Sequence, residues 1–176
     1  LYGLTKEALK LKVKIYENSP VNNINVLKNY CEIKSLNTII KSNIVVVTCN
    51  GYLDDLLGKI RNKFMTINNY IIATEPLGES KALELIKNNY AVSDTRFMID
   101  YYRLSEDWRM LFGGGETLTN NYLENPKNFV CSRMYKIFPD LKKYNIDFCW
   151  GGTLAITVNR FPNFGTLKNN NIIYAH

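Results

Sequence analysis

The segment YYRLSEDWRMLFGGGE, residues 101–116, constrains the fold more than any other part of the sequence. Two apolar and aromatic runs flank a short polar turn at residues 105–107, which is the pattern of a β-hairpin. The second run ends in three consecutive glycines. They indicate a backbone that another group approaches closely, or a bend that no side chain would allow. An ordinary hairpin with a loose exit also fits. Tyr101 and Arg103 are expected on one face of their strand and Tyr102 on the other.

Length and composition predict a globular chain. A length of 176 residues is typical of one domain or two small ones, and 46% hydrophobic residues are enough to form a core. No apolar run reaches transmembrane length. The first residues lack both a methionine and the layout of a signal peptide, and a strand is predicted to end the chain. We therefore expect the chain to be part of a longer one at both ends.

Charge and cysteine usage disfavour several function classes. The net charge of +6 comes from scattered lysines, without a stripe that combines basic residues with stacking aromatics. A solvated basic surface is therefore favoured over nucleic-acid binding. Four separated cysteines and a single histidine, His176, argue against a structural zinc site, a disulfide scaffold and a Ser–His or Cys–His nucleophile. Reduced thiols are typical of the cytosol, so we expect a cytoplasmic location.

Apolar periodicity predicts a mixture of helices and strands. Helices are predicted over residues 5–12, 53–60, 80–88 and 126–138, with Thr5 and Asn125 as N-caps and Pro126 as the first residue of the last helix. Strands are predicted over residues 13–16, 65–74, 90–92, 97–99 and 172–175, with a small meander over residues 24–27, 30–33 and 38–40.

Two further strands carry signals of a binding site. Residues 43–48, NIVVVT, are continuously apolar, which is typical of a strand buried on both faces. Ligands bind at the carboxyl ends of such strands, so the residues after Val47 are candidates for a cofactor contact, with a plain turn as the alternative. Residues 146–158 form a long strand that contains two glycines. Glycines inside a strand are costly unless another group lies close against them.

The residues alone do not define a mechanism. No pair of carboxylates can be assigned the roles of acid and base, and no GxGxxG motif is present. From the pattern alone, the chain is a globular α/β or α+β piece with two glycine-rich strands.

Seven segments in sequence order resemble the D-amino-acid oxidase superfamily of FAD-dependent oxidoreductases, and within it the γ-glutamylputrescine oxidoreductase type. Each segment is weak alone, whereas seven in the right order are specific and cover nearly the whole chain. The segments are ALKLKVKIYENSPVNNI (8–24), NIVVVTCNGYLDDL (43–56), IIATEPL (71–77), DTRFMIDYYRLSEDWRMLFGGGE (94–116), FPDL (138–141), DFCWGGTLAITVNRFPNFG (147–165) and NNNIIYA (169–175).

The resemblance implies an α+β fold derived from an α/β parent. It has a mostly antiparallel substrate domain flanked by helices, plus incomplete elements of a Rossmann-like FAD-binding domain. The implied boundaries are 1–60 for the partial FAD-binding domain, 61–146 for the substrate-binding domain, and 147–176 for the strand beside the flavin and the return to the first domain. The family's GxGxxG motif and C-terminal glycine-rich turn would lie outside the chain. We therefore expect this fragment alone to bind FAD weakly or not at all, and to be inactive.

The resemblance also implies two groups of FAD contacts. The first group matches the adenine and ADP side of the cofactor and consists of Val21, Thr48, Cys49, Asn50 and Gly51. The second group matches the strand beside the isoalloxazine and consists of Trp150, Gly151 and Gly152. Small residues there would let the ring lie close to the backbone.

Substrate contacts are implied at Tyr101, Arg103 and Leu154. Tyr101 and Arg103 match the strand that faces the other side of the flavin ring, so the hairpin and residues 150–152 are expected as opposite walls of one pocket. Family members that oxidise free amino acids carry an arginine at the position of Leu154, where it holds the substrate carboxylate. Leucine cannot do this, which favours an amine or polyamine derivative. Arg103 is a candidate for binding a remote carboxylate, with a structural ion pair as the alternative.

The implied reaction is oxidation of a C–N bond of an amine such as γ-glutamylputrescine, with hydride transfer to FAD. A neutral amine needs no strong base, and we assign no catalytic residue and no metal. The expected partner is a small-molecule amine. The alternative hypotheses are a non-catalytic accessory or binding subunit with the same substrate-domain fold, and a plain structural domain.

Overall fold

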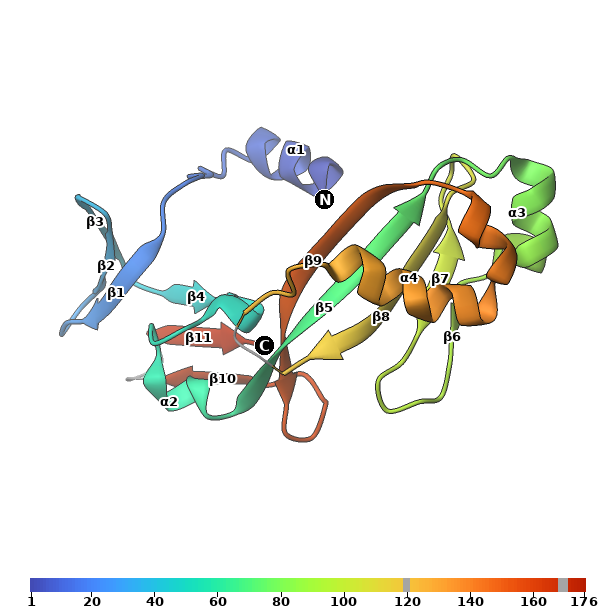
Figure 1. The fold of residues 1–176 in the computed structure, drawn as a ribbon. Helices are drawn as coiled ribbons and strands as arrows, with labels where there is room; N and C mark the ends of the chain where they lie inside the picture. The colour runs from blue at the N-terminus through green and yellow to red at the C-terminus, as the bar shows by residue number, and fades with distance from the viewer. Residues whose placement is uncertain (119–120, 168–170) are drawn as a thin grey trace. The chain divides into compact units, whose positions relative to one another are not determined.

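A computed structural model of the protein describes residues 1–118, 121–167 and 171–176 (Figure 1). These residues form two compact units. Unit 1 comprises residues 1–48, 55–58 and 163–175, and unit 2 comprises residues 49–54, 59–162 and 176. The first two residues of the NNNIIYA segment, 169 and 170, lie outside the described residues.

The described residues of unit 1 form a helix and two small sheets. The helix is α1 (Tyr2–Lys10), and an antiparallel meander with the strand order β1–β2–β3 follows it. In the second sheet, β11 runs antiparallel to β10 and parallel to β4. The strands are β1 (Val21–Val26), β2 (Cys31–Ser35), β3 (Thr38–Ser42), β4 (Val45–Val47), β10 (Phe164–Leu167) and β11 (Ile172–Ala175). The predicted meander and the predicted last strand are confirmed.

Two predictions for the start of unit 1 are wrong. Thr5 is not an N-cap, because α1 begins at Tyr2 and the Thr5 hydroxyl donates a hydrogen bond to the Leu1 carbonyl at 3.3 Å. Residues 13–16 do not form a strand, and Val13 and Ile15 are exposed. Their alternating pattern matches a strand, but no strand among the described residues supplies the backbone hydrogen bonds that a strand requires.

Strand β4 is shorter and more exposed than its sequence predicts. The side chain of Val46 is 60% exposed, whereas Val47 is buried, so the strand is not buried on both faces. Among the described strands, β4 pairs with β11, along one edge. The run of β-branched residues in β4 therefore reflects the preference of these residues for strands and does not indicate that the strand is buried.

The predicted helix over residues 53–60 is also wrong. The chain instead forms a 3₁₀ turn, η1 (Asn50–Tyr52), and a four-residue helix, α2 (Gly58–Arg61). Asp54 adopts the left-handed conformation with a φ of 45°, which interrupts a helix.

Unit 2 is organised around one antiparallel sheet with the strand order β6–β7–β8–β5–β9. Its strands are β5 (Phe64–Thr74), β6 (Val92–Ser93), β7 (Tyr101–Leu104), β8 (Met110–Thr117) and β9 (Ile146–Thr157). Besides η1 and most of α2, its helices are α3 (Glu79–Leu85), η2 (Lys87–Asn89), α4 (Pro126–Ile137) and η3 (Pro139–Lys143). The β7–β8 hairpin, the two long strands and the mostly antiparallel α+β fold are confirmed. Residues 97–99 are not a strand but part of the loop before β7.

Helix α4 covers one face of this sheet (Figure 1). It starts as predicted, with Pro126 as its first residue and the Asn125 side chain accepting a hydrogen bond from the Asn128 amide at 3.2 Å. The core between α4 and the sheet is formed by buried apolar side chains, which include Tyr70, Ile72, Leu104, Met110, Phe112, Val130 and Met134. In the described part of unit 2, no helix covers the opposite face.

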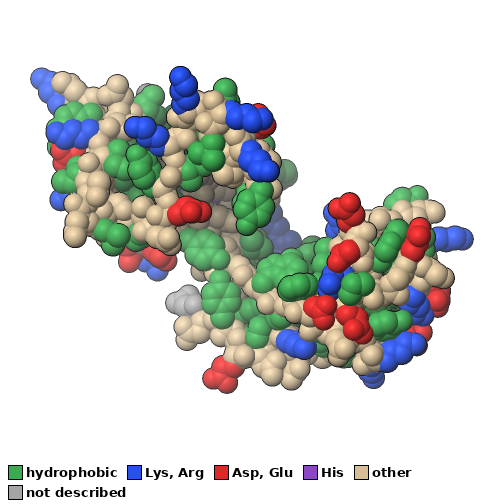
Figure 2. Space-filling view, turned by 90° about the horizontal axis from the view of Figure 1, so that it is seen from above, with side chains coloured by type: hydrophobic (Ala, Val, Ile, Leu, Met, Phe, Trp, Pro, Cys, Tyr) green, Lys and Arg blue, Asp and Glu red, His purple; other side chains and the backbone are tan. Residues whose placement is uncertain are grey.

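The surface carries charges of both signs. On the face shown in Figure 2, Lys and Arg side chains are interspersed with Asp and Glu and do not form one stripe. No helix within the described ranges is long and apolar enough to cross a membrane.

A buried carboxylate fixes the loop before β7 onto α4. Asp100 is 1% exposed, and its Oδ1 accepts a hydrogen bond from Nε of Arg133 on α4 at 2.6 Å. Its Oδ2 is paired with the guanidinium of Arg96. The Arg133 guanidinium also donates to the Met98 carbonyl at 3.2 Å. A buried charge is tolerated only when it is paired in this way.

The first prediction concerns this carboxylate. We expect Asp100→Asn to lower the free energy of unfolding by about 3 kcal/mol, because the two guanidinium groups lose their shared counter-charge. The control is Asp140→Asn, which removes a carboxylate that is 64% exposed and paired with Lys81 at 3.4 Å. This change should cost less than about 0.5 kcal/mol. Urea denaturation followed by tryptophan fluorescence reports on unit 2, since Trp108 and Trp150 both lie there. Equal effects of the two variants would contradict the role of Asp100.

Candidate functional site

The uncovered face of the unit 2 sheet collects the predicted substrate residues and part of the predicted flavin strand. Directly paired residues of antiparallel strands point to the same face. One row across four strands consists of Tyr101, Gly113, Ile71 and Trp150. A second row contains Arg103 and Leu111, and further pairs join Asn69 to Gly152 and Ile67 to Leu154. We call this surface the open face; its members used below are Asn69, Ile71, Tyr101, Arg103, Leu111, Gly113, Trp150, Gly152 and Leu154.

The expected arrangement of two opposite walls is wrong. Strands β7 and β9 belong to the same sheet, with β8 and β5 between them. Tyr101 and Trp150 are therefore about 14 Å apart in one row, because three strand spacings separate them, and both side chains point to the same face of the sheet. The hairpin and residues 150–152 thus lie side by side on one surface and do not face each other. Sequence patterns identify strands but not their order in a sheet, which is why the order was missed.

Tyr101 lies across β8 and bonds to β5. Its hydroxyl donates a hydrogen bond to Oδ1 of Asn69 at 2.6 Å. The ring passes directly over Gly113, where an added Cβ would overlap it. Burial raises the pKa of the Tyr101 hydroxyl, the hydrogen bond to Asn69 lowers it, and the Glu116 carboxylate raises it further. The hydroxyl therefore keeps its proton and directs it to Asn69.

Arg103 extends from the next position on this face. Its guanidinium is exposed, and its Nε donates to the Leu104 carbonyl at 3.3 Å. It forms no ion pair with any residue in the described part of the chain, so the alternative of a structural ion pair is not observed. A cation without a counter-charge on this face remains available to an anionic group.

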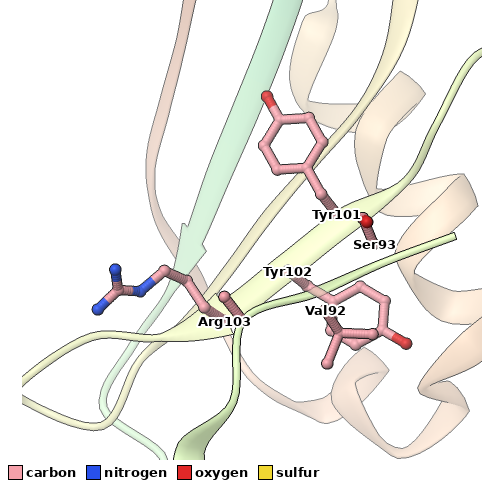
Figure 3. Close-up of a pocket in the computed structure, with 6 residues that line it drawn as sticks. Val92, Ser93, Tyr101, Tyr102 and Arg103 are labelled. Atoms are coloured by element: carbon pink, nitrogen blue, oxygen red, sulfur yellow. The ribbon is translucent and has the colours of Figure 1, made fainter.

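An open hollow of about 210 Å³ lies along β6 and β7, lined by Ala91, Val92, Ser93, Tyr101, Tyr102 and Arg103. Figure 3 shows Tyr101 and Tyr102 leaving β7 on opposite sides. Tyr102 stacks on Phe112 in the core, with ring centroids 5.6 Å apart. The predicted division of Tyr101 and Tyr102 between two faces is thus confirmed.

The two glycines of β9 have different surroundings. A Cβ on Gly151 would lie 2.7 Å from the ring of Tyr70, so core packing explains this glycine. A Cβ on Gly152 would meet the Tyr52 hydroxyl at 3.6 Å, which is ordinary contact, so no described residue of unit 2 requires a glycine there. Trp150 is 45% exposed and Leu154 is 37% exposed on either side of it. Gly152 therefore leaves a flat, partly apolar area on the open face.

The turn η1 covers the free edge of β9. The Asn50 side chain accepts a hydrogen bond from the Ala155 amide at 2.8 Å, and the Tyr52 hydroxyl accepts one from the Thr153 amide at 2.9 Å. Gly51 is buried, and a Cβ there would lie 2.7 Å from the Thr153 carbonyl oxygen. Covering an edge strand prevents unwanted pairing. Asn50 and Gly51 thus hold η1 against β9, and a contact with a cofactor would be an additional role.

The other predicted FAD contacts, Val21, Thr48 and Cys49, are divided between the two units. Val21 begins β1 and Thr48 follows β4; both are exposed residues of unit 1. Cys49 is partly buried and belongs to unit 2. The cofactor contacts of all these residues remain predictions.

Sequence reasoning missed Asn69 and Glu116. Asn69 is 7% exposed in the middle of β5 and is paired with Gly152 and Glu116 on its two sides. The available signal was the polar pair Asn68–Asn69 inside an otherwise apolar strand, since buried polar side chains need specific partners.

Comparisons with known proteins show what the whole chain is similar to. Residues 1–176 match the family described as "FAD dependent oxidoreductase". Probable oxidoreductase OrdL of Haemophilus influenzae is 36% identical over 180 residues, which cover 99% of this chain and 40% of that protein. Gamma-glutamylputrescine oxidoreductase of Escherichia coli is 37% identical over 127 residues, which cover 72% of this chain and 30% of that protein. The chain thus spans less than half the length of these curated relatives.

Solved structures share the fold. L-proline dehydrogenase from P. horikoshii has a TM-score of 0.77 and 21% identity, with 99% of this chain and 48% of that chain covered. Glycine oxidase from Bacillus cereus has a TM-score of 0.77 and 18% identity, also with 99% of this chain and 48% of that chain covered. At these identities the likeness establishes the fold.

The second prediction compares two glycines of the open face. We expect Gly113→Ala to lower the free energy of unfolding by about 1–3 kcal/mol, because the new methyl group displaces the Tyr101 ring and its bond to Asn69. Gly152→Ala is the matched control. It should leave stability unchanged or raise it by up to about 1 kcal/mol, because the methyl group has space and alanine restricts the unfolded chain. Urea denaturation measures both, and a Gly113→Ala variant as stable as the wild type would refute the packing described for Tyr101.

Proposed function

Because the chain belongs to the family of FAD-dependent oxidoreductases, we propose that the whole protein oxidises a C–N bond of an amine, and that the open face carries its flavin and substrate. The observation that carries this proposal is the register of the sheet. It brings Tyr101 and Arg103 onto the same surface as Trp150, Gly152 and Leu154. Apolar surface and a few polar groups on one surface are what a small-molecule site requires.

The residues present fit a flavin beside β9. Gly152 has room where a side chain would otherwise stand, so a flat ring would approach the backbone there, next to the exposed part of Trp150. We assign the isoalloxazine to Trp150, Gly151 and Gly152. We assign the nucleotide part to Val21, Thr48, Cys49, Asn50 and Gly51. Bound FAD would supply the acceptor for the hydride that leaves the carbon next to the nitrogen.

The domain division is a further proposal, which rests on the resemblance to the family. We propose that residues 1–60 are part of the FAD-binding domain, residues 61–146 are the substrate-binding domain, and residues 147–176 are the strand beside the flavin with the return to the first domain. None of the four cysteines, all of which lie in the described ranges, forms a disulfide. A cytoplasmic location is in keeping with that and stays a prediction.

The proposed substrate is an amine or polyamine derivative such as γ-glutamylputrescine. Leu154 places an apolar, uncharged side chain on the open face, which disfavours a carboxylate at that point. Arg103 offers a cation at another point of the same face. A substrate with an uncharged stretch and a remote carboxylate, as a γ-glutamyl group presents, fits both residues. The Escherichia coli relative that carries the name gamma-glutamylputrescine oxidoreductase supports this choice.

The chain's own residues would act by binding and positioning. Tyr101 is held by Asn69 and would contact the substrate with a fixed hydroxyl. Arg103 would orient the carboxylate, and Leu154 would pack against the apolar stretch. Holding the reacting carbon in one orientation is the main contribution a protein makes to cofactor chemistry.

The third prediction tests the flavin assignment in the full-length protein. We expect Gly152→Ala to weaken FAD binding by at least about fivefold, because the added methyl group overlaps the ring. Gly58→Ala is the control, since a Cβ at Gly58 meets no other atom within 4 Å. Flavin fluorescence titration of the apoprotein measures both dissociation constants. Undiminished FAD affinity in Gly152→Ala would remove Gly152 from the flavin site. A wild-type protein that binds no flavin would instead support the accessory-subunit hypothesis.

The fourth prediction tests the substrate assignment. In the full-length protein, Leu154→Arg should lower kcat/KM for γ-glutamylputrescine by about tenfold or more, because it places an unpaired charge against the apolar stretch. Leu118→Arg introduces the same charge at a position that is 69% exposed and should leave kcat/KM unchanged. Steady-state kinetics at matched flavin content make the comparison. Unchanged or improved kinetics in Leu154→Arg would contradict the proposed pocket.

A further inference from the structure

Strand β8 changes the face of its side chains at a bulge next to Glu116. On β5, Ile71 and Asn69 are two residues apart, whereas their partners on β8, Gly113 and Glu116, are three residues apart. The extra residue shifts the alternation of β8 by one position. Gly115 has a φ of +79°, which is the left-handed conformation that a glycine in such a bulge supplies. In a regular strand, residues 115 and 117 would continue the face of Gly113; here Glu116 does.

Glu116 therefore joins the open face beside Asn69 and Tyr101. Glu116 is the cross-strand partner of Asn69, whose side chain accepts the hydrogen bond from the Tyr101 hydroxyl. In keeping with this placement, the Glu116 carboxylate contributes to raising the pKa of the Tyr101 hydroxyl. Glu116 is partly buried. In the described part of the chain, it forms no ion pair with any Lys, Arg or His. A partly buried carboxylate without a counter-charge is unfavourable in the free protein, and a bound cation would relieve that cost.

The Tyr101 hydroxyl oxygen, like the Glu116 carboxylate beside it, can accept hydrogen bonds from a cation. Because the Tyr101 proton is directed to Asn69, the lone pairs of the Tyr101 oxygen remain as acceptors on the open face. A carboxylate and an acceptor oxygen together suit a group with several N–H donors and a positive charge, such as an ammonium.

The open face therefore carries charges of opposite sign at two points along β8. Arg103 is paired with Leu111, and Glu116 lies five residues further along the same strand. The bulge takes up one of these residues, because the partners of Leu111 and Glu116 on β5, Ala73 and Asn69, are four residues apart. The two positions are therefore about 13 Å apart along the strand, and the long side chains of arginine and glutamate shorten the gap between the charges. Ile71 and Leu111 provide apolar surface between them.

We propose that Glu116, with the Tyr101 oxygen beside it, binds the ammonium end of the substrate, while Arg103 binds its carboxylate end. This inference rests on the proposed function and deepens it. The substrate class is an extended chain that carries a positive group and a negative group at opposite ends. The three-glycine segment with its bulge is the device that brings Glu116 to this face, since bulges commonly redirect a side chain next to a functional site.

The test uses two ligands that differ in one group. 8-Aminooctanoate carries an ammonium and a carboxylate, and 8-hydroxyoctanoate replaces the ammonium by a hydroxyl. Isothermal titration calorimetry is performed on the full-length, FAD-loaded protein, with the flavin chemically reduced and oxygen excluded so that no turnover occurs. Glu116→Gln keeps the size of the side chain and removes its charge. Glu106→Gln removes the same charge from the exposed turn of the same hairpin and is the matched control.

We expect Glu116→Gln to weaken binding of 8-aminooctanoate by about tenfold or more, the size of one charge-assisted hydrogen bond. Binding of 8-hydroxyoctanoate should stay within about twofold, and Glu106→Gln should leave both constants unchanged. Glu116→Asp, which keeps the charge, should recover most of the lost affinity. Arg103→Gln should weaken both ligands. Flavin content and the thermal midpoint of Glu116→Gln should match the wild type, which excludes a general structural defect.

Equal affinity of Glu116→Gln and wild type for 8-aminooctanoate would overturn the inference, as would an equal loss for both ligands. These results would leave the proposed function intact if the wild type still oxidises γ-glutamylputrescine. A wild-type protein that oxidises no amine would refute the proposed function, and this is read from a separate turnover assay on oxidised enzyme.

Discussion

The structure of unit 2 depends on the absence of three side chains in the middle of β8. The space next to Gly113 is filled by the ring of Tyr101, the space next to Gly114 by the carboxylate of Asp100, and the space next to Gly115 by the ring of Phe129. Each of these groups comes from a different element around the strand. A side chain at any of the three positions would displace its neighbour, so the glycines allow the strand, the preceding loop and α4 to pack closely. They also set the bulge that turns Glu116 toward the open face.

This packing explains which parts of the fold could be predicted from the sequence. The 64–74 and 146–157 strands were predictable because they are long and apolar, and the helix that starts at Pro126 was predictable because its cap is local. The segments 13–16 and 97–99 show strand-like composition but gain no strand partner, and partners are a property of the tertiary fold. Close approach at the glycine segment was one of the alternatives that the sequence left open, and the contacts around the three glycines confirm it. The position of the segment inside β8, and not at the end of a loose hairpin, depends on contacts from Asp100 and Phe129 that no local pattern records.

For the candidate site, the sequence suggested individual residues but not their arrangement. Resemblance to a family suggested Tyr101, Arg103, Trp150 and Gly152 as candidates one by one, but not that they share one face of the sheet. That arrangement follows from the register of four strands, and it is what connects the flavin assignment to the substrate assignment. Asn69 and Glu116 were not predicted, because their positions on the open face depend on how the strands pair. Asn69 accepts a hydrogen bond from Tyr101, and Glu116 points to the open face because of the bulge. The same surface thus combines an apolar centre with charges of opposite sign.

A crystal structure of the full-length protein with bound FAD would show whether the open face binds the flavin and the substrate. We expect the isoalloxazine ring to lie in van der Waals contact with Gly152 on the open face, with Tyr101, Arg103 and Glu116 on the substrate side of the ring. A flavin ring that contacts none of these residues, or an open face filled by another segment of the protein, would contradict this expectation.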